Sequence, residues 1–160
     1  RTSLVTKRQH LREHGFCRLP NFLSQDEIRD YLIESETCEW HNHLSTRTGT
    51  PSNLFFSPTS YKSFDRVALM KMKPHAIQDW HVDGSRSSVI IHPLTDNYAC
   101  GLTESGPYDG VVLLDVKRRH AVFNNEHTRI GLQIMFDESA DDTLINIIKN
   151  GDLYEERNYS

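Results

Sequence analysis

Two residues that can bind a metal ion, His81 and Asp83, stand two positions apart in the sequence. Side chains two apart on a β-strand leave from the same face, so both can contact one ion. A third ligand from His120, farther along the chain, would complete a set of two imidazoles and one carboxylate. Such a set occupies one face of an octahedral ion and leaves three positions open, which is typical of non-haem Fe(II) sites that react with oxygen.

The sequence around this motif supports its interpretation as part of a metal site. An isolated His-x-Asp is a weak signal, because a chain with nine histidines meets it easily by chance. Here it lies at the end of a predicted strand and is followed by Gly84. His120 comes after a basic turn, residues 117–119, that ends an apolar strand. Alone, His120 is an ordinary strand-edge histidine; with the other two it makes a candidate metal site.

The segment 128–136 predicts a strand with two different faces. One face is aliphatic and aromatic, and the other carries Arg129, Gly131, Gln133 and Met135. Two interpretations are open. Either the aliphatic face is core and Arg129 faces solvent, or Arg129 lies in the ligand-binding interior of a barrel whose outer, aliphatic face packs against helices. In the second case Gly131 leaves room for a ligand, and the guanidinium offers bidentate contacts to a carboxylate.

Taken together, His81-x-Asp83 and the segment His120-Ala-Val-Phe-Asn-Asn-Glu-His-Thr-Arg129 resemble the signature of 2-oxoglutarate/Fe(II)-dependent oxygenases. Within that family, the motifs resemble those of the aspartyl/asparaginyl and prolyl hydroxylase-like branch. The nine-residue step from the distal histidine to the arginine, the His-x-Val-x-Asn start and a preceding Gly-Val-Val-Leu-Leu-Asp strand are similar to that branch. The resemblance covers about residues 66–137 and, more loosely, the helix-strand-helix prefix.

This resemblance implies the following roles. His81, Asp83 and His120 would bind Fe(II) and form the catalytic centre, while Arg129 would pair with the C5 carboxylate of the cosubstrate 2-oxoglutarate. The implied reaction is hydroxylation of an unactivated C–H bond, with release of succinate and CO₂. The metal and cosubstrate do this chemistry, and the protein positions and shields it. The substrate would be an amino acid, a protein side chain or a small metabolite.

Relatives often carry a further arginine or histidine, on the strand after His-x-Asp, that also contacts 2-oxoglutarate. His92 is the candidate here and is expected as a second cosubstrate-binding residue, with a purely structural histidine as the alternative. Arg86 comes earlier, in the turn, where it would instead bind an acidic group on the substrate. His75 and His127 are not expected to be ligands.

The elements that must position these residues begin with a helical prefix over residues 1–40. Helices are expected over 3–14 and 25–35, with a short strand, 16–19, between them. The second helix begins at a capping box, in which Ser24 is the N-cap and a glutamate stands three residues later.

Residues 41–63 are rich in Ser, Thr, Asn and Pro and are expected to form a long polar loop. His41 and His43 are interpreted as solvated loop histidines because no third ligand is nearby. The position and composition of this loop suggest substrate contacts from Arg47, Asn53, Phe55 and Phe56.

A series of short strands follows, expected over 66–72, 78–83, 87–94, 111–116, 120–123 and 128–136. Residues 106–110 are expected as a turn, and Asn124-Asn125 could form a tight turn with positive φ. The segment 141–149 is a short helix or strand. The pattern predicts a mainly β protein with flanking helices: a double-stranded β-helix (jelly roll, cupin-like) whose core is 64–137.

Length and composition fit a single domain over all 160 residues, and the resemblance implies that this domain is oxygenase-like. A net charge of −4 makes a nucleic-acid substrate unlikely, and no apolar run reaches the roughly 20 residues of a membrane helix. Three widely spaced cysteines favour a reducing, cytoplasmic compartment over a disulfide framework. The oligomeric state stays open.

Two alternatives to the oxygenase remain. One is a non-catalytic jelly-roll or cupin binding module that holds a metal structurally or not at all. The other is a cupin-like metalloenzyme that does not use 2-oxoglutarate.

Overall fold

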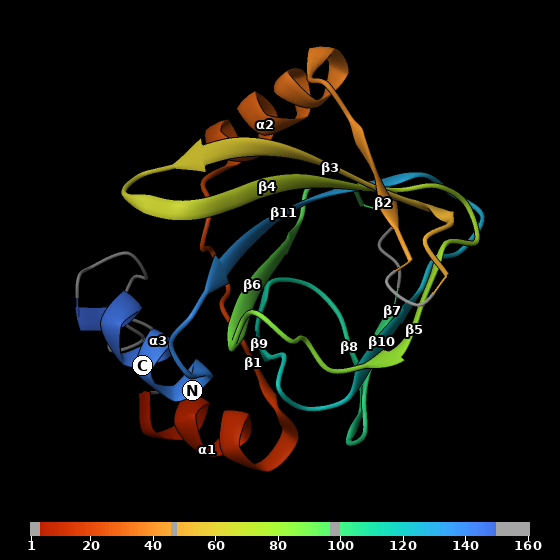
Figure 1. Cartoon of the computed structure of the whole chain (residues 1–160). Helices are drawn as coiled ribbons and strands as arrows, with labels where there is room; N and C mark the ends of the chain where they lie inside the picture. Colours follow the sequence, from red (N-terminus) through yellow and green to blue (C-terminus); the bar gives the residue numbers. More distant parts are fainter. Residues whose placement is uncertain (1–3, 46–47, 97–99, 150–160) are drawn as a thin grey trace.

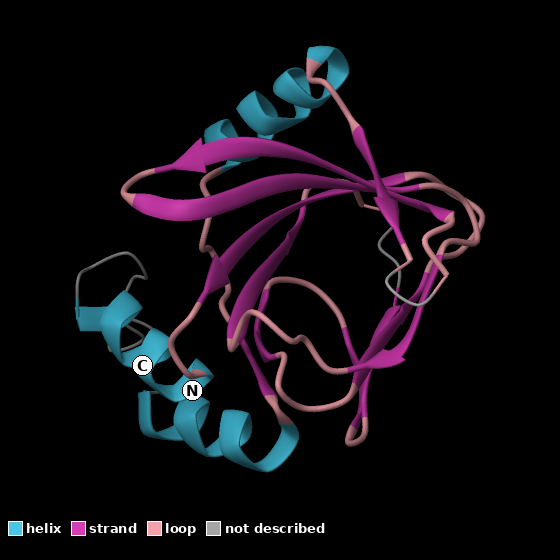
Figure 2. Cartoon of the chain, in the orientation of Figure 1, coloured by secondary structure: helices cyan, strands magenta, loops and turns pink. Residues whose placement is uncertain are grey.

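The computed structural model describes residues 4–45, 48–96 and 100–149. Within these residues, three helices flank two β-sheets (Figures 1 and 2). The helices are α1 (Leu4–His14), α2 (Gln25–Thr37) and α3 (Ala140–Lys149). The strands are β1 (Phe16–Arg18), β2 (His41–Leu44), β3 (Pro51–Tyr61), β4 (Phe64–Met72), β5 (Ile77–His81), β6 (Ser88–Pro93), β7 (Cys100–Thr103), β8 (Gly106–Tyr108), β9 (Val112–Asp115), β10 (His120–Phe123) and β11 (Arg129–Phe136).

All strand pairs are antiparallel. The larger sheet has the order β1-β9-β6-β11-β4-β3-β2, and the smaller has the order β5-β10-β7-β8. From β4 onward the chain passes back and forth between them: β4, β6, β9 and β11 belong to the larger sheet, and β5, β7, β8 and β10 to the smaller. This alternation is the double-stranded β-helix that the sequence predicted, and the mainly β class with flanking helices is confirmed.

The helices cover the outer face of the larger sheet. Leu132 and Ile134 of β11 are fully buried in one apolar cluster with Leu11 of α1 and Leu144 of α3. Toward the other edge of the same sheet, α2 lies over β3 and β4 (Figure 1), where the Tyr31 hydroxyl donates to a β3 carbonyl at 2.6 Å. The aliphatic face of β11 therefore packs against the helical layer, as the second interpretation of its alternation predicted.

Local residues define the end of α1 and the start of α2. Gly15 follows α1 with φ +83°, a left-handed conformation that a side chain would strain. The predicted capping box of α2 is present: Ser24 Oγ accepts from the Glu27 amide at 3.1 Å, and the Glu27 carboxylate accepts from the Ser24 amide at 2.9 Å. The segment 141–149, which the sequence predicted to be either a helix or a strand, belongs to helix α3. No helix in the described ranges combines the length and the apolar character needed to cross a membrane.

The prediction of a long loop over 41–63 was wrong. The segment forms β2 and β3, and β3 pairs along its length with β4. The two prolines that argued against a strand are tolerated by position. Pro51 is the first residue of β3, and at Pro58 the strand has passed the end of β2, so its missing amide hydrogen faces an unpaired edge. Arg47, one of the expected substrate contacts, lies outside the described residues.

Two expected turns also differ. Residues 106–108 of the expected 106–110 turn form β8, which pairs with β7. Neither Asn124 nor Asn125 has a positive φ. Instead Asn124 is buried, and its side-chain amide donates to the carbonyls of Met72, Lys73 and His127 at 2.8–3.2 Å. These bonds fix the corner at which the chain leaves β10 in one sheet and enters β11 in the other.

Candidate metal centre and cavity

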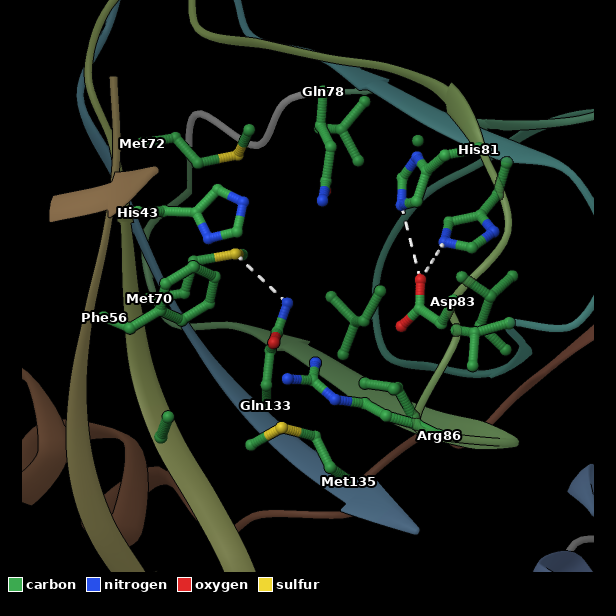
Figure 3. A pocket seen from close by; sticks show the side chains of 18 of the residues that line it. His43, Phe56, Met70, Met72, Gln78, His81, Asp83, Arg86, Gln133 and Met135 are labelled. Carbon is green, nitrogen blue, oxygen red and sulfur yellow. Dashed lines mark hydrogen bonds and ion pairs between the residues drawn. The ribbon is translucent and has the colours of Figure 1, made fainter. Parts of the chain in front are cut away.

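The smaller sheet brings the three candidate ligands together. His81 is the last residue of β5 and His120 the first of β10, and the two are opposite each other in the antiparallel pair. Their ring centroids are 4.3 Å apart. Asp83 follows β5 by two residues, and its Oδ1 lies 3.4 Å from His81 Nε2 and 3.3 Å from His120 Nε2 (Figure 3). Because the ligand atoms all lie within 4.8 Å of one another, one ion can contact all three.

Backbone contacts fix the orientation of these side chains. His81 Nδ1 is 2.6 Å from the carbonyl of Asp79, and His120 Nδ1 is 2.8 Å from the carbonyl of Arg118. A carbonyl can only accept, so each Nδ1 carries a hydrogen, and each Nε2 faces Asp83, where it can share a proton with the carboxylate or offer its lone pair to an ion. The Asp83 amide donates to the Val116 carbonyl at 2.9 Å, which holds the carboxylate over the end of the smaller sheet.

The electrostatics of the triad suit a cation. Burial raises the pKa of Asp83, but hydrogen bonds and charge from His120 and His81 outweigh burial and hold this pKa well below its usual range. The hydrogen bond to Asp83 raises the pKa of His81 despite its burial. Asp83 therefore remains an anionic ligand, and an ion would take the place of the protons shared with the imidazoles. Two imidazoles and one carboxylate are the donors that Fe(II) accepts in open sites, so these residues fit the predicted ion.

No other group in the described part of the chain gathers three or more potential metal ligands in this way. His75 and His127 stand outside the triad, as expected. His41 is exposed, as the interpretation of a solvated histidine requires. His43 is not: it is half-buried, packs against Phe56 with ring centroids 5.7 Å apart, and lines the cavity described next.

A cavity of about 230 Å³ opens between the two sheets, and the triad forms part of its wall. Arg129 lines it and is only 2% exposed. Gln133 and Met135 follow on the same face of β11, which confirms that this face is the barrel interior. Gly131 plays a different part from the one expected. A Cβ there would lie 3.2 Å from the His92 carbonyl and 3.6 Å from the Met70 methyl, so the glycine makes room for protein atoms, and it does not line the cavity.

His92, expected as a second cosubstrate-binding residue, is not among the residues that line this cavity. On β6 the side chains of Val89 and Ile91 point into the cavity, so the alternate residues, among them His92, point to the opposite face. His92 is 4% exposed, and its Nδ1 lies 2.7 Å from the Pro93 carbonyl. Burial lowers its pKa, as expected for a neutral structural histidine in the outer core.

Arg86 does line the cavity, next to the triad in the chain and pointing inward below Asp83 in Figure 3. Strand alternation had already placed Gln133 and Met135 on the face of Arg129. Sequence reasoning missed several further lining residues: His43, Gln78, Tyr108, Met70 and Met72. No signal in the sequence marks His43, because its strand was read as a loop. Of the expected substrate contacts, Phe56 lines the cavity, whereas Phe55 faces outward under Lys71 and Lys73.

No protein-family model matches the sequence, and no curated protein does. Solved structures do match. A Pseudomonas putida prolyl-4-hydroxylase superposes with a TM-score of 0.65 at 13% identity, covering 84% of this chain and 99% of that one. A Trichoplax adhaerens prolyl hydroxylase in complex with a hypoxia-inducible-factor peptide gives 0.63 at 11% identity, covering 88% and 91%. The epimerase SnoN in complex with Fe³⁺, α-ketoglutarate and nogalamycin RO gives 0.62 at 10% identity, covering 82% of each chain.

The chain therefore has the fold of the 2-oxoglutarate/Fe(II) oxygenases, the fold of the family that its sequence resembles. At these identities the similarity establishes the fold. The candidate site rests on this chain's own residues: a convergent His-Asp-His triad and a buried arginine in one cavity.

Proposed function

We propose that the chain is an Fe(II)- and 2-oxoglutarate-dependent dioxygenase that hydroxylates an unactivated C–H bond, with release of succinate and CO₂. One observation carries the proposal. Two imidazoles and a carboxylate meet within 4.8 Å at the wall of a cavity, with both Nδ1 atoms engaged by backbone carbonyls. When bound, the ion and the keto acid supply the oxygen chemistry, and the polypeptide supplies position and shielding.

The three ligands would hold the ion from one side. His81 and Asp83 come from the end of β5 and His120 from the start of β10, so all three belong to one corner of the smaller sheet. The remaining coordination positions would then face the cavity. Fixed imidazole tautomers mean that little reorganisation is needed when the ion enters, which favours affinity.

Arg129 would hold and orient the C5 carboxylate of 2-oxoglutarate. Its guanidinium is a planar fork with five donors, which matches a carboxylate in bidentate geometry. At 2% exposure the pair would form away from bulk water, where a charge-assisted hydrogen bond is stronger. His81, Asp83 and His120, which would bind the ion, would be the catalytic residues.

Apolar side chains would keep water from the reaction. The wall of the cavity on β4 is formed by Met70 and Met72, with Phe56 from the neighbouring β3. These side chains carry no group that titrates near neutral pH. Methionine is flexible, so this wall can adapt to the shape of a substrate.

An amino acid, a protein side chain or a small metabolite would fit as the substrate, and the net charge of −4 gives no reason to expect a nucleic acid. One of the similar structures holds a peptide, and another is an epimerase. The fold therefore does not fix the outcome of the reaction, which makes product analysis essential. A cytoplasmic location, predicted from the cysteines, belongs to the same proposal.

Anaerobic titration tests the cosubstrate directly. Fe(II) and 2-oxoglutarate are added under argon, and the weak visible charge-transfer band of the chelate is recorded. Asp83→Ala should abolish the band by removing a metal ligand, and Arg129→Gln should weaken 2-oxoglutarate binding by more than tenfold. His127→Ala is a matched control, because this exposed histidine lies outside the triad and should leave the band unchanged.

Turnover is then measured as succinate formed from 2-oxoglutarate on admission of air, with and without candidate substrates. Failure to bind iron would end the proposal and favour the non-catalytic module. Oxygen consumption that does not depend on 2-oxoglutarate would favour a metalloenzyme of another kind. Succinate formation that is lost in His81→Ala and retained in His127→Ala would support the dioxygenase.

A further inference from the structure

Two arginines line the cavity, and the proposed cosubstrate uses only one of them. They enter from opposite ends of β11. Arg129 is the first residue of that strand, paired with Met72, whereas the turn that carries Arg86 is tied to its last residue by a hydrogen bond from the Ser87 amide to the Phe136 carbonyl at 3.0 Å. At about 3.4 Å per residue, the two attachment points are separated by roughly 24 Å along the strand.

The proposed binding mode of 2-oxoglutarate uses Arg129 and the ion, and it assigns no role to Arg86. The C5 carboxylate of the cosubstrate would lie at Arg129 and its other end at the ion held by the triad. Arg86 approaches from the far end of the strand and points into the cavity on the side of Gln133 and Met135, away from His43 and Met72 (Figure 3). The second cation therefore faces the part of the cavity that the cosubstrate leaves free.

The charge of Arg86 is not neutralised by the protein. Its Nε is buried without a hydrogen-bond partner, and among the residues that the structure describes no carboxylate lies within ion-pair distance of it. The nearest acidic influence is Asp83, which the two imidazoles already engage. Arg66 provides the contrast: it is paired with Asp137 at 2.6 Å. A desolvated guanidinium that faces a cavity without an anion is a costly arrangement unless a ligand supplies the anion.

The walls around Arg86 are apolar. Val89, Leu114, Val116 and Met135 line the cavity on its side, and Gln133 adds one amide whose Nε2 donates to Met70 Sδ at 3.2 Å. A ligand that satisfies both the cation and these walls combines one carboxylate with a compact apolar body.

We propose that Arg86 binds the carboxylate of the substrate, and that the substrate is a small organic acid whose apolar body lies between Arg86 and the triad. This inference rests on the proposed function, since it places a C–H bond of that body toward the metal. It narrows the substrate class from amino acids, side chains and metabolites in general to free acids. An acidic peptide side chain offers the same carboxylate, so the test separates the two sources.

The test uses a matched acid and amide. Protein loaded with Fe(II) and 2-oxoglutarate under argon is titrated calorimetrically with hexanoate, with hexanamide, and with the capped peptide acetyl-Ala-Glu-Ala-amide. Hexanoate should bind at least tenfold more tightly than hexanamide, and the peptide should bind more weakly than hexanoate. In Arg86→Gln the preference for the acid should disappear, whereas Arg86→Lys should recover part of it. Arg66→Gln is the control arginine and should keep the full preference.

Several results would overturn the inference: equal binding of hexanoate and hexanamide, a preference that survives in Arg86→Gln, binding of the peptide alone, or competition between hexanoate and 2-oxoglutarate. The last would place the acid at Arg129. The charge-transfer band keeps this test separate from the proposed function. If the band forms in Arg86→Gln as in the parent protein, the variant is folded and binds the cosubstrate, so a change in acid affinity reports on Arg86. If the band never forms in the parent protein, the proposed function fails first.

Discussion

Metal binding should stabilise the protein, and the change Asp83→Asn should remove most of that stabilisation. Asp83 is the one anion among three ligands, and its Oδ1 is within 3.4 Å of both imidazoles. An ion that binds the folded chain at 100 times its Kd adds about 2.7 kcal/mol to the free energy of unfolding. For a chain of this size, about 2–4 °C of Tm corresponds to each kcal/mol, so the parent protein should gain about 5–11 °C.

Asparagine has nearly the same shape as aspartate but carries no charge. If the loss of the negative charge weakens binding of the ion a hundredfold, the same metal concentration equals the Kd of the variant. The metal then adds only about 0.4 kcal/mol to the free energy of unfolding, or roughly 1 °C of Tm. The assay is thermal unfolding followed by circular dichroism under argon, with Fe(II) or redox-inert Mn(II), reversed by a chelator. His127→Ala is the matched control and should keep the full shift. A full shift in Asp83→Asn, or none in the parent protein, would refute the assignment of the triad.

Three further predictions concern the scaffold. Leu132→Ala removes a fully buried side chain between the larger sheet and the helices, and should lower the free energy of unfolding by about 2–5 kcal/mol in urea titrations with an unchanged m-value. Asn124→Ala deletes a side chain that donates to three carbonyls at the β10–β11 corner, and should cost about 1–3 kcal/mol in the same titration. The pKa of Asp141 is lowered by its hydrogen bond to Arg8, which outweighs burial. The contribution of Asp141 is therefore present above pH 4 and is lost as pH falls through the lowered pKa. Asp141→Asn should reduce the urea midpoint slightly at pH 7 and by less at pH 2.5; an equal reduction at both would show that the ion pair is not responsible.

The sequence predicted that His81 and Asp83 lie together because they stand two residues apart, and they do so although β5 ends at His81. The pairing of β5 with β10 brings His120 opposite His81, a long-range contact that spacing alone does not define. Strand alternation defined the interior face of β11. Alternation did not place His92 on the outer face, because no local signal in the sequence defines which face of β6 is interior. The outer face carries Ser88 and His92, whereas the cavity face carries Val89 and Ile91, so the polar residues of this strand lie opposite to where a polar interior would put them.

The segment 41–63 failed for a different reason. A proline in a strand is acceptable only where the neighbouring strand has ended, and the end of β2 relative to Pro58 is a fact of tertiary pairing. With β3 read as a loop, His43 and Phe56 could not be placed in the cavity. Arg86 was found, but the absence of a protein partner for its Nε, which gives it a role, is visible only in three dimensions.

The position of β11 has a consequence for how the chain acquires its structure. It is the last strand of the described chain, yet it occupies the middle of the larger sheet, between β4 and β6. Without β11 the strand order divides into two parts that share no strand pairing, β2-β3-β4 and β1-β9-β6. Such non-local pairing is slow to form. We expect folding to be completed only after release of this strand, so that nascent chains truncated before residue 129 expose both of its docking edges and are sensitive to protease.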